Sequence, residues 1–182
     1  MTRPSDYRLI LPESWFRIDL EPGSREKAVA ALAERQFQGV DNAPHLKAEA
    51  RRKLLATADD AFRSGGIELY VSLQTAAGFP LAAALVVTLT PPQEPDRALV
   101  TPSRLAETLT RDGRQVTVIR LPAGQAVRVR TEDPPATSLD IHIPVPGSGA
   151  YLLLSFSTPL APLAGALVGM FDAIAATLRW IP

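Results

Sequence analysis

The sequence predicts an α+β fold, in which one antiparallel β-sheet of about six strands packs against helices, including a long C-terminal helix. Near Gly66 the spacing of apolar residues changes from the helical period of 3.6 to the strand period of 2. Four later strands follow one another with short connections, which favours antiparallel pairing. A parallel sheet would need a helix after nearly every strand. The length of 182 residues fits a single domain, residues 1–182.

The first part of the chain is expected to hold two short strands and two helices. Aromatic and β-branched residues between turn residues indicate the strands, and apolar residues at helical spacing indicate the helices. The expected strands are Tyr7–Leu11 and Trp15–Leu20, and the expected helices run from Ser24 to about Phe37 and, after a break at Asp41–Pro44, from Pro44 to about Arg63. The second helix is expected to bury the stripe Leu46, Ala50, Leu54, Ala58 and Phe62.

The middle of the chain is expected to form the sheet. Ile67, Leu69, Val71 and Leu73 alternate with other residues, which indicates a strand with one buried face. The runs Leu81–Leu89 and Tyr151–Phe156 are apolar on both sides and indicate central strands. Between these runs we expect a proline-rich connection at Pro91–Pro95, a helix at Pro102–Leu109, a hairpin of Gln115–Leu121 and Gln125–Thr131, a loop at Glu132–Thr137 and a strand at Leu139–Val145.

The last expected element is a helix from about Ala161 to Arg179. It is apolar on nearly every side, so it should pack on the sheet and also on the second helix or a partner subunit. The stretch Pro159–Leu178 is close to the length of a membrane span, but its prolines, glycines and Asp172 argue against one. With no secretory signal at the N-terminus, we expect no membrane span and a cytoplasmic location.

Charge and composition argue against several functions. Lys and Arg number 19, as do Asp and Glu, and both signs are evenly spread, so the chain lacks the positive field that nucleic-acid binding requires. Without Cys there is no disulfide, thiolate metal site or cysteine nucleophile. The two histidines, His45 and His142, are far apart and follow no metal-binding spacing. We expect neither a metal nor another cofactor.

Known catalytic and phosphate-binding motifs do not occur in the sequence. There is no GxSxG, and Gly147–Gly149 reads as a turn between strands. GxGxxG and GxxxxGK are missing too. The adjacent acids Asp59–Asp60 point apart on a helix, and Glu132–Asp133 lie in an expected loop, so neither pair makes an acid–base dyad. The sequence therefore predicts a protein that is not an enzyme.

One polar constellation follows from strand alternation. If Val127 and Val129 face the core, Arg128 and Arg130 point away from it. If Leu139, Ile141 and Ile143 of the next strand also face the core, Asp140 and His142 point away from it as well. On neighbouring strands these side chains would share one face. They could bind an anion or a partner, with a histidine able to change charge near neutral pH, or form a solvated face with cross-strand ion pairs. The four residues are Arg128, Arg130, Asp140 and His142.

Two short segments resemble the ends of a known family. The strand entry Leu11–Trp15, with its P-x-x-W pattern, and the closing segment Phe171–Trp180 resemble the two ends of Mog1p/PsbP-like domains. The resemblance implies an antiparallel sheet closed by a C-terminal helix, and a non-catalytic binding or accessory subunit of a larger assembly. The Arg-rich, Lys-poor composition also resembles actinobacterial proteins, some of them associated with specialised secretion. The matching segments carry no functional residue of the family.

Three functions are compatible with these observations. The first is a non-catalytic interaction or accessory module that binds a protein partner or a second copy of itself, through the final helix or an exposed sheet edge, within a larger, secretion-related assembly. The second is a small-molecule-binding domain with a pocket between sheet and helices. The third is an enzyme of unrecognised type that uses the four polar residues named above. We expect the first.

Overall fold

A computed structural model describes residues 3–37, 44–76, 79–91, 100–133 and 135–182. Its main feature is a seven-stranded antiparallel sheet in the order β2-β3-β6-β10-β9-β8-β7. The strands are β1 (Asp6–Arg8), β2 (Trp15–Asp19), β3 (Gly66–Ser72), β4 (Thr75–Ala76), β5 (Phe79–Pro80), β6 (Ala84–Thr90), β7 (Arg114–Leu121), β8 (Gly124–Asp133), β9 (Ala136–Pro144), β10 (Tyr151–Thr158) and β11 (Arg179–Ile181). The helices are α1 (Arg25–Gln36), α2 (Pro44–Arg63), α3 (Pro102–Leu109), the short 3-10 helix η1 (Ala161–Leu163) and α4 (Ala164–Ala175). The predicted α+β class is confirmed, with one strand more than expected in the sheet.

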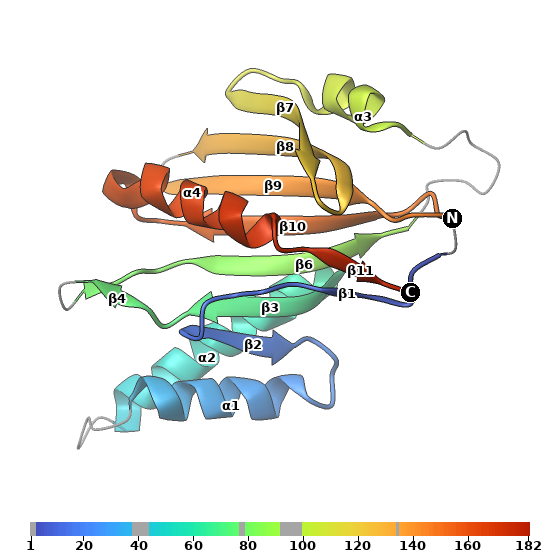
Figure 1. Cartoon of the computed structure of the whole chain (residues 1–182). Helices are drawn as coiled ribbons and strands as arrows, with labels where there is room; N and C mark the ends of the chain where they lie inside the picture. Colours follow the sequence, from blue (N-terminus) through green and yellow to red (C-terminus); the bar gives the residue numbers. More distant parts are fainter. Residues whose placement is uncertain (1–2, 38–43, 77–78, 92–99, 134) are drawn as a thin grey trace.

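The main sheet is covered on both faces (Figure 1). One face, called here the α4 face, carries α4 and a two-stranded ribbon in which β1 pairs antiparallel with β11. The opposite face, called the α2 face, carries α1 and α2 over β2, β3 and β6. Helix α3 contacts β7 and β8 farther along the sheet. The predicted central strands are confirmed, because β6 and β10 lie side by side in the interior of the sheet.

Two apolar clusters hold these layers together. Under α4, Phe171 is fully buried and stacks on Phe156 of β10, with ring centroids 4.8 Å apart, while Trp15 meets Phe171 edge-on at 6.4 Å. On the α2 face, residues of α1 and α2 enclose Leu69 of β3. Strand β6 contributes to both clusters, which explains why its sequence lacks a polar side, whereas β10 contributes to the cluster under α4.

The C-terminal helix is shorter than predicted and packs differently. It ends at Ala175, and Arg179–Ile181 instead forms β11. It does not contact α2, because the sheet lies between them. Its outward side is made of small residues, Gly165, Ala166 and Gly169, and so leaves little apolar surface to bury. None of the helices in the described part of the chain is long and apolar enough to cross a membrane.

Two further expectations need correction. The loop predicted at Glu132–Thr137 is mostly strand, because β8 continues to Asp133 and β9 begins at Ala136. The stripe predicted on α2 is only partly buried: Leu46 and Phe62 are exposed, since the helix packs through Ala58 and Ala61. Residues 41–43 of the expected helix break and 92–95 of the proline-rich connection lie outside the described residues. The hairpin of β7 and β8 is confirmed.

Candidate functional site

The four residues predicted to form one polar surface lie on adjacent strands but on opposite faces. Strand β8 pairs with β9 so that Arg128 is opposite Ile141 and Val129 is opposite Asp140. Directly opposite residues in an antiparallel pair project to the same face. Arg128 and Arg130 therefore lie on the α4 face, whereas Asp140 and His142 lie on the α2 face. The prediction that all four share a face is wrong.

The reason is that the two strands bury different faces of the same sheet. Val127 and Val129 of β8 are buried on the α2 face, and α3 contacts this strand. Leu139 and Ile141 of β9 are instead buried under α4. Apolar and polar residues therefore alternate within each strand as predicted, but the apolar residues of the two strands face different sides of the sheet.

The two arginines on the α4 face are already paired. Arg128 donates from Nε and Nη2 to the two carboxylate oxygens of Asp172, at 2.8 and 3.0 Å, and so ties α4 to β8. Arg130 donates to Glu132 on its own strand at 2.6 Å. Both cations thus have internal partners, and the Arg128 pair joins two elements of the fold.

On the other face, His142 is partly buried between neighbouring strands. Its cross-strand partners are Val127 on β8 and Leu153 on β10. Burial lowers the pKa of His142; the Asp140 carboxylate opposes this effect, and the Arg114 guanidinium adds to it. The neutral form of His142 is therefore favoured at neutral pH.

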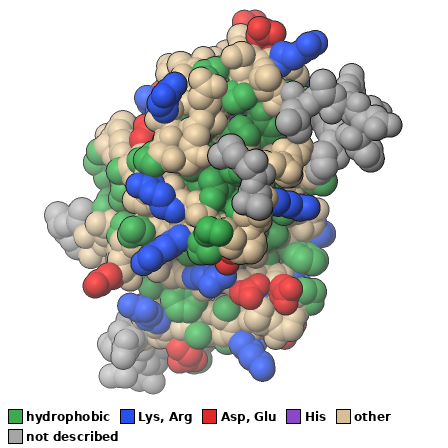
Figure 2. Space-filling view, turned by 45° about the vertical axis from the view of Figure 1, so that its right-hand side comes forward, with side chains coloured by type: hydrophobic (Ala, Val, Ile, Leu, Met, Phe, Trp, Pro, Cys, Tyr) green, Lys and Arg blue, Asp and Glu red, His purple; other side chains and the backbone are tan. Residues whose placement is uncertain are grey.

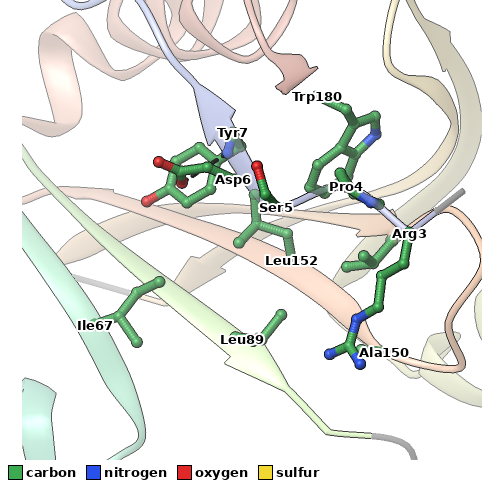
Figure 3. A pocket seen from close by; sticks show the side chains of 11 residues that line it. Arg3, Pro4, Ser5, Asp6, Tyr7, Ile67, Leu89, Ala150, Leu152 and Trp180 are labelled. Carbon is green, nitrogen blue, oxygen red and sulfur yellow. Dashed lines mark hydrogen bonds between the residues drawn. The ribbon is translucent and has the colours of Figure 1, made fainter. Parts of the chain in front are cut away.

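A pocket of about 190 Å³ lies where the β1–β11 ribbon crosses the α4 face (Figure 3). We call it the ribbon pocket. On one side it is lined by the N-terminal segment 3–7 and by Trp180 of β11, and on the other by apolar side chains of the main sheet and of the segment after β9. These sheet-side residues are Ile67, Leu89, Val145, Ala150 and Leu152.

A β-bulge gives the pocket one of its walls. The register of β3 against β6 shifts between Gly66 and Glu68, so one extra residue is inserted at Ile67. Ile67 consequently leaves the α2 face that strict alternation predicted and lines the pocket beside Leu89. The side chains of Ile67 and Leu89 remain 41% and 44% exposed. The protein's own residues therefore leave these two apolar side chains incompletely covered.

A network centred on Glu68 fixes the ribbon to the sheet beside the pocket. The hydroxyl groups of Tyr7 on β1 and Tyr70 on β3 both donate to Oε2 of Glu68, at 2.6 and 2.9 Å, and Arg17 of β2 forms an ion pair with the other carboxylate oxygen. Burial, together with the Glu68 carboxylate, raises the pKa of Tyr7 and of Tyr70 well above the usual range. Both phenols stay protonated and act as hydrogen-bond donors.

The ribbon pocket is suited to apolar binding and offers little for catalysis. Its lining residues with polar side-chain atoms are Arg3, Ser5, Asp6, Tyr7 and Trp180, and none of the lining residues is a histidine. Asp6 already accepts a hydrogen bond from the backbone amide of Tyr7, and the Ser5 hydroxyl donates to the carbonyl of Pro182. Across the described ranges, no group of three or more His, Asp or Glu side chains could hold a metal ion.

Sequence reasoning missed this pocket because it is built from distant segments. The segment 3–7, the bulge at Ile67 and Trp180 meet only after the two ends of the chain pair with each other. The available signals were weak: Ile67 next to the flexible pair Gly65–Gly66, and aromatic residues near both chain ends.

Comparison with known proteins gives two distant structural likenesses. No protein-family model matches the chain, and no curated protein matches its sequence. LpqN of Mycobacterium tuberculosis, described as involved in cell envelope biogenesis, is 14% identical, with 97% of this chain and 83% of LpqN covered and a TM-score of 0.44. The PsbP protein CyanoP of Synechocystis sp. PCC 6803 is 15% identical, and the match covers 98% of this chain and 91% of CyanoP with the same TM-score of 0.44. CyanoP is a PsbP protein, and the terminal segments resemble the PsbP-like family, but neither likeness is close enough to transfer a function.

Proposed function

We propose that this chain is a non-catalytic protein-binding module whose ribbon pocket accepts one apolar side chain of a protein partner. The observation that carries the proposal is the pair of half-covered side chains, Ile67 and Leu89, inside a small apolar pocket. Apolar side chains left in contact with water inside a concave site gain free energy when a partner covers them.

The size of the pocket favours a side chain over a free small molecule. Sites for drug-sized ligands and cofactors usually enclose about 300–1,000 Å³, whereas this pocket measures about 190 Å³. Protein interfaces, in contrast, commonly use single buried anchor residues in pockets of this kind. A small-molecule ligand is the alternative that the experiment below distinguishes.

The face of the molecule in Figure 2 has the composition of an interface that forms and separates. On the side of the molecule seen in Figure 2, hydrophobic side chains are interrupted by basic and acidic ones instead of forming one continuous apolar patch. Non-obligate interfaces have this mixed composition. Membership of a larger, secretion-related assembly and the cytoplasmic location both stay predictions from the sequence.

The experiment places a photo-crosslinking amino acid at position 89 and, in a second variant, at position 163. Leu163 lies at the end of η1, outside the pocket, and is 43% exposed, so it matches Leu89 in residue type and exposure. After irradiation in the native host, we expect a protein adduct at position 89 that is missing at position 163. Mass spectrometry then identifies the captured partner.

The captured partner is next purified and its affinity is measured against two glutamate variants. Leu89→Glu puts a charge into the apolar contact and should weaken binding at least about tenfold, which corresponds to the loss of one buried aliphatic side chain. Leu163→Glu should leave the affinity within about twofold of the wild-type value. An adduct with the mass of a small molecule, or equal effects of the two variants, would contradict the proposal.

A further inference from the structure

The edge strand β7 is a second surface on which another chain can be added. It pairs with β8 along one side, and no strand in the described residues pairs with its other side. Eight residues long, it exceeds β2, the five-residue strand at the opposite edge. An unpaired edge presents a row of backbone N–H and C=O groups that can bond to another extended chain.

The side chains of β7 leave this edge open. Helix α3 contacts β7, yet Gln115 and Thr117 are exposed on one face of the strand, and Val118 and Arg120 on the other. The strand contains no proline, and four consecutive β-branched residues, 116–119, favour extended backbone. Of the usual features that protect an edge from pairing, β7 has two positive charges and a contact with α3, but neither a proline nor a β-bulge.

The charges on β7 are all of one sign. Arg114 and Arg120 lie an even number of residues apart and therefore project to the same face, about 20 Å apart at the usual rise per strand residue. Neither arginine forms an ion pair within the part of the chain that the structure describes, and β7 contains no carboxylate. Between them, Val116 and Val118 lie beside Val129 and Val127 of β8 and extend an apolar ladder toward the edge.

These charges select the type of strand that can be added. A second copy would bring another two arginines and no carboxylate to the same edge, and like charges on adjacent strands are destabilising. A strand with a carboxylate at each end would instead face both arginines. We propose that β7 receives an extended segment of a partner protein in which two acidic residues are six positions apart and β-branched residues fill the positions between.

This inference does not depend on the ribbon pocket, because no residue of β7 lines it. Binding at one surface can therefore fail while binding at the other persists. The two tests also use different positions and different readouts, so their failures are distinguishable.

The experiment titrates the full-length protein with a capped synthetic peptide, Glu-Thr-Val-Thr-Val-Thr-Glu. We expect amide hydrogen exchange of β7 to slow on binding, because a newly paired strand protects edge amides from solvent. Two control peptides separate strand addition from simple charge attraction. One replaces both Glu by Lys, and the other replaces the central Thr by Pro, which cannot donate a backbone hydrogen bond. Neither control should protect β7.

Charge reversal then tests the two arginines. The double variant Arg114→Glu with Arg120→Glu should bind the acidic peptide at least about tenfold more weakly and should now bind the Lys peptide. The control, Arg51→Glu with Arg52→Glu on exposed positions of α2, changes the net charge equally and should leave binding unchanged. Unchanged exchange in the buried strand β10 verifies folding. No protection of β7 by the acidic peptide, or equal loss of binding in both double variants, would overturn the proposal.

Discussion

At the scale of single residues, His142 shows how strand pairing decides the behaviour of a polar group. It sits between Val127 and Leu153 on neighbouring strands, and burial lowers its pKa below the ordinary value of 6.5. The unfolded chain, in which burial is lost, then binds a proton more readily than the folded protein does. Protonation of His142 therefore favours unfolding.

We predict that His142 makes the protein less stable as the pH falls. Its contribution is fully present above about pH 6.5 and is lost progressively as the pH decreases toward the lowered pKa of the folded state. His142→Gln, which cannot gain a proton, should remove this part of the pH dependence. The measurement is the free energy of unfolding by urea between pH 7.5 and 5.5, for the wild type and the variant.

His45→Gln is the matched control, because His45 is exposed on α2. It should reproduce the pH dependence of the wild type. If His142→Gln has the same slope as the wild type over this range, then burial of the imidazole does not penalise its charged form.

The same residues show where prediction from the sequence ends. Alternation along β8 and β9 correctly assigned the buried residues of each strand, such as Val129 and Ile141, because a strand has a fixed period of two. It could not tell which of the two sheet faces each strand buries. That depends on which helix packs on each strand: α3 contacts β8 and α4 contacts β9, and neither helix has a local signature in the strand that it covers.

At the scale of elements, the bulge at the start of β3 depends on one glycine. A Cβ at Gly66 would lie 2.7 Å from the carbonyl oxygen of Ala61, 2.9 Å from Val86 Cγ1 and 3.0 Å from Leu20 Cδ1. The first of these contacts is with the backbone of α2 and cannot be relieved by a side-chain rotation. The close approach of α2 to β3 thus requires a residue without a side chain.

We therefore predict that Gly66→Ala destabilises the protein by about 1–3 kcal/mol, the usual cost of overpacking a well-packed region. Gly23→Ala is the control, since a Cβ there meets nothing within 4 Å, and it should change stability by no more than about 0.5 kcal/mol. Both values follow from denaturant unfolding. Equal stability of the two variants would mean that α2 can shift away from β3 without cost.

Elements were predicted well where their signal is local and poorly where it is not. The positions of α1, α2 and α3 and the β7–β8 hairpin followed from helical spacing, proline and turn residues. The end of α4 did not, because Ile174 and Leu178 keep the helical spacing and both are buried. The chain leaves the helix there because Arg179–Ile181 pairs with β1, more than 170 residues earlier in the sequence.

At the scale of the whole molecule, the two chain ends form one structural unit on the sheet. Strands β1 and β11 pair with each other, and the backbone amide of Ile10 donates to the Thr177 hydroxyl at 2.9 Å. The indole of Trp180 donates to the carbonyl of Ala123 at 3.2 Å. The Tyr7 hydroxyl links the ribbon to Glu68 on β3, directly beside the ribbon pocket. Ribbon attachment and the shape of the pocket are therefore coupled.

We predict that Tyr7→Phe loosens the ribbon and costs about 1–2 kcal/mol of unfolding free energy, because Glu68 loses one of its two tyrosine donors. Hydrogen exchange should become faster in β1 and β11, while the buried strand β10 keeps its protection. Tyr151→Phe is the matched control: it removes a tyrosine hydrogen bond to the Val100 carbonyl on the α2 face, the face opposite to the ribbon, and should leave exchange of β1 unchanged. If Tyr7→Phe alters neither β1 nor β11, strand pairing between the chain ends is sufficient to hold the ribbon on the sheet, and the Glu68 network does not position the wall of the pocket.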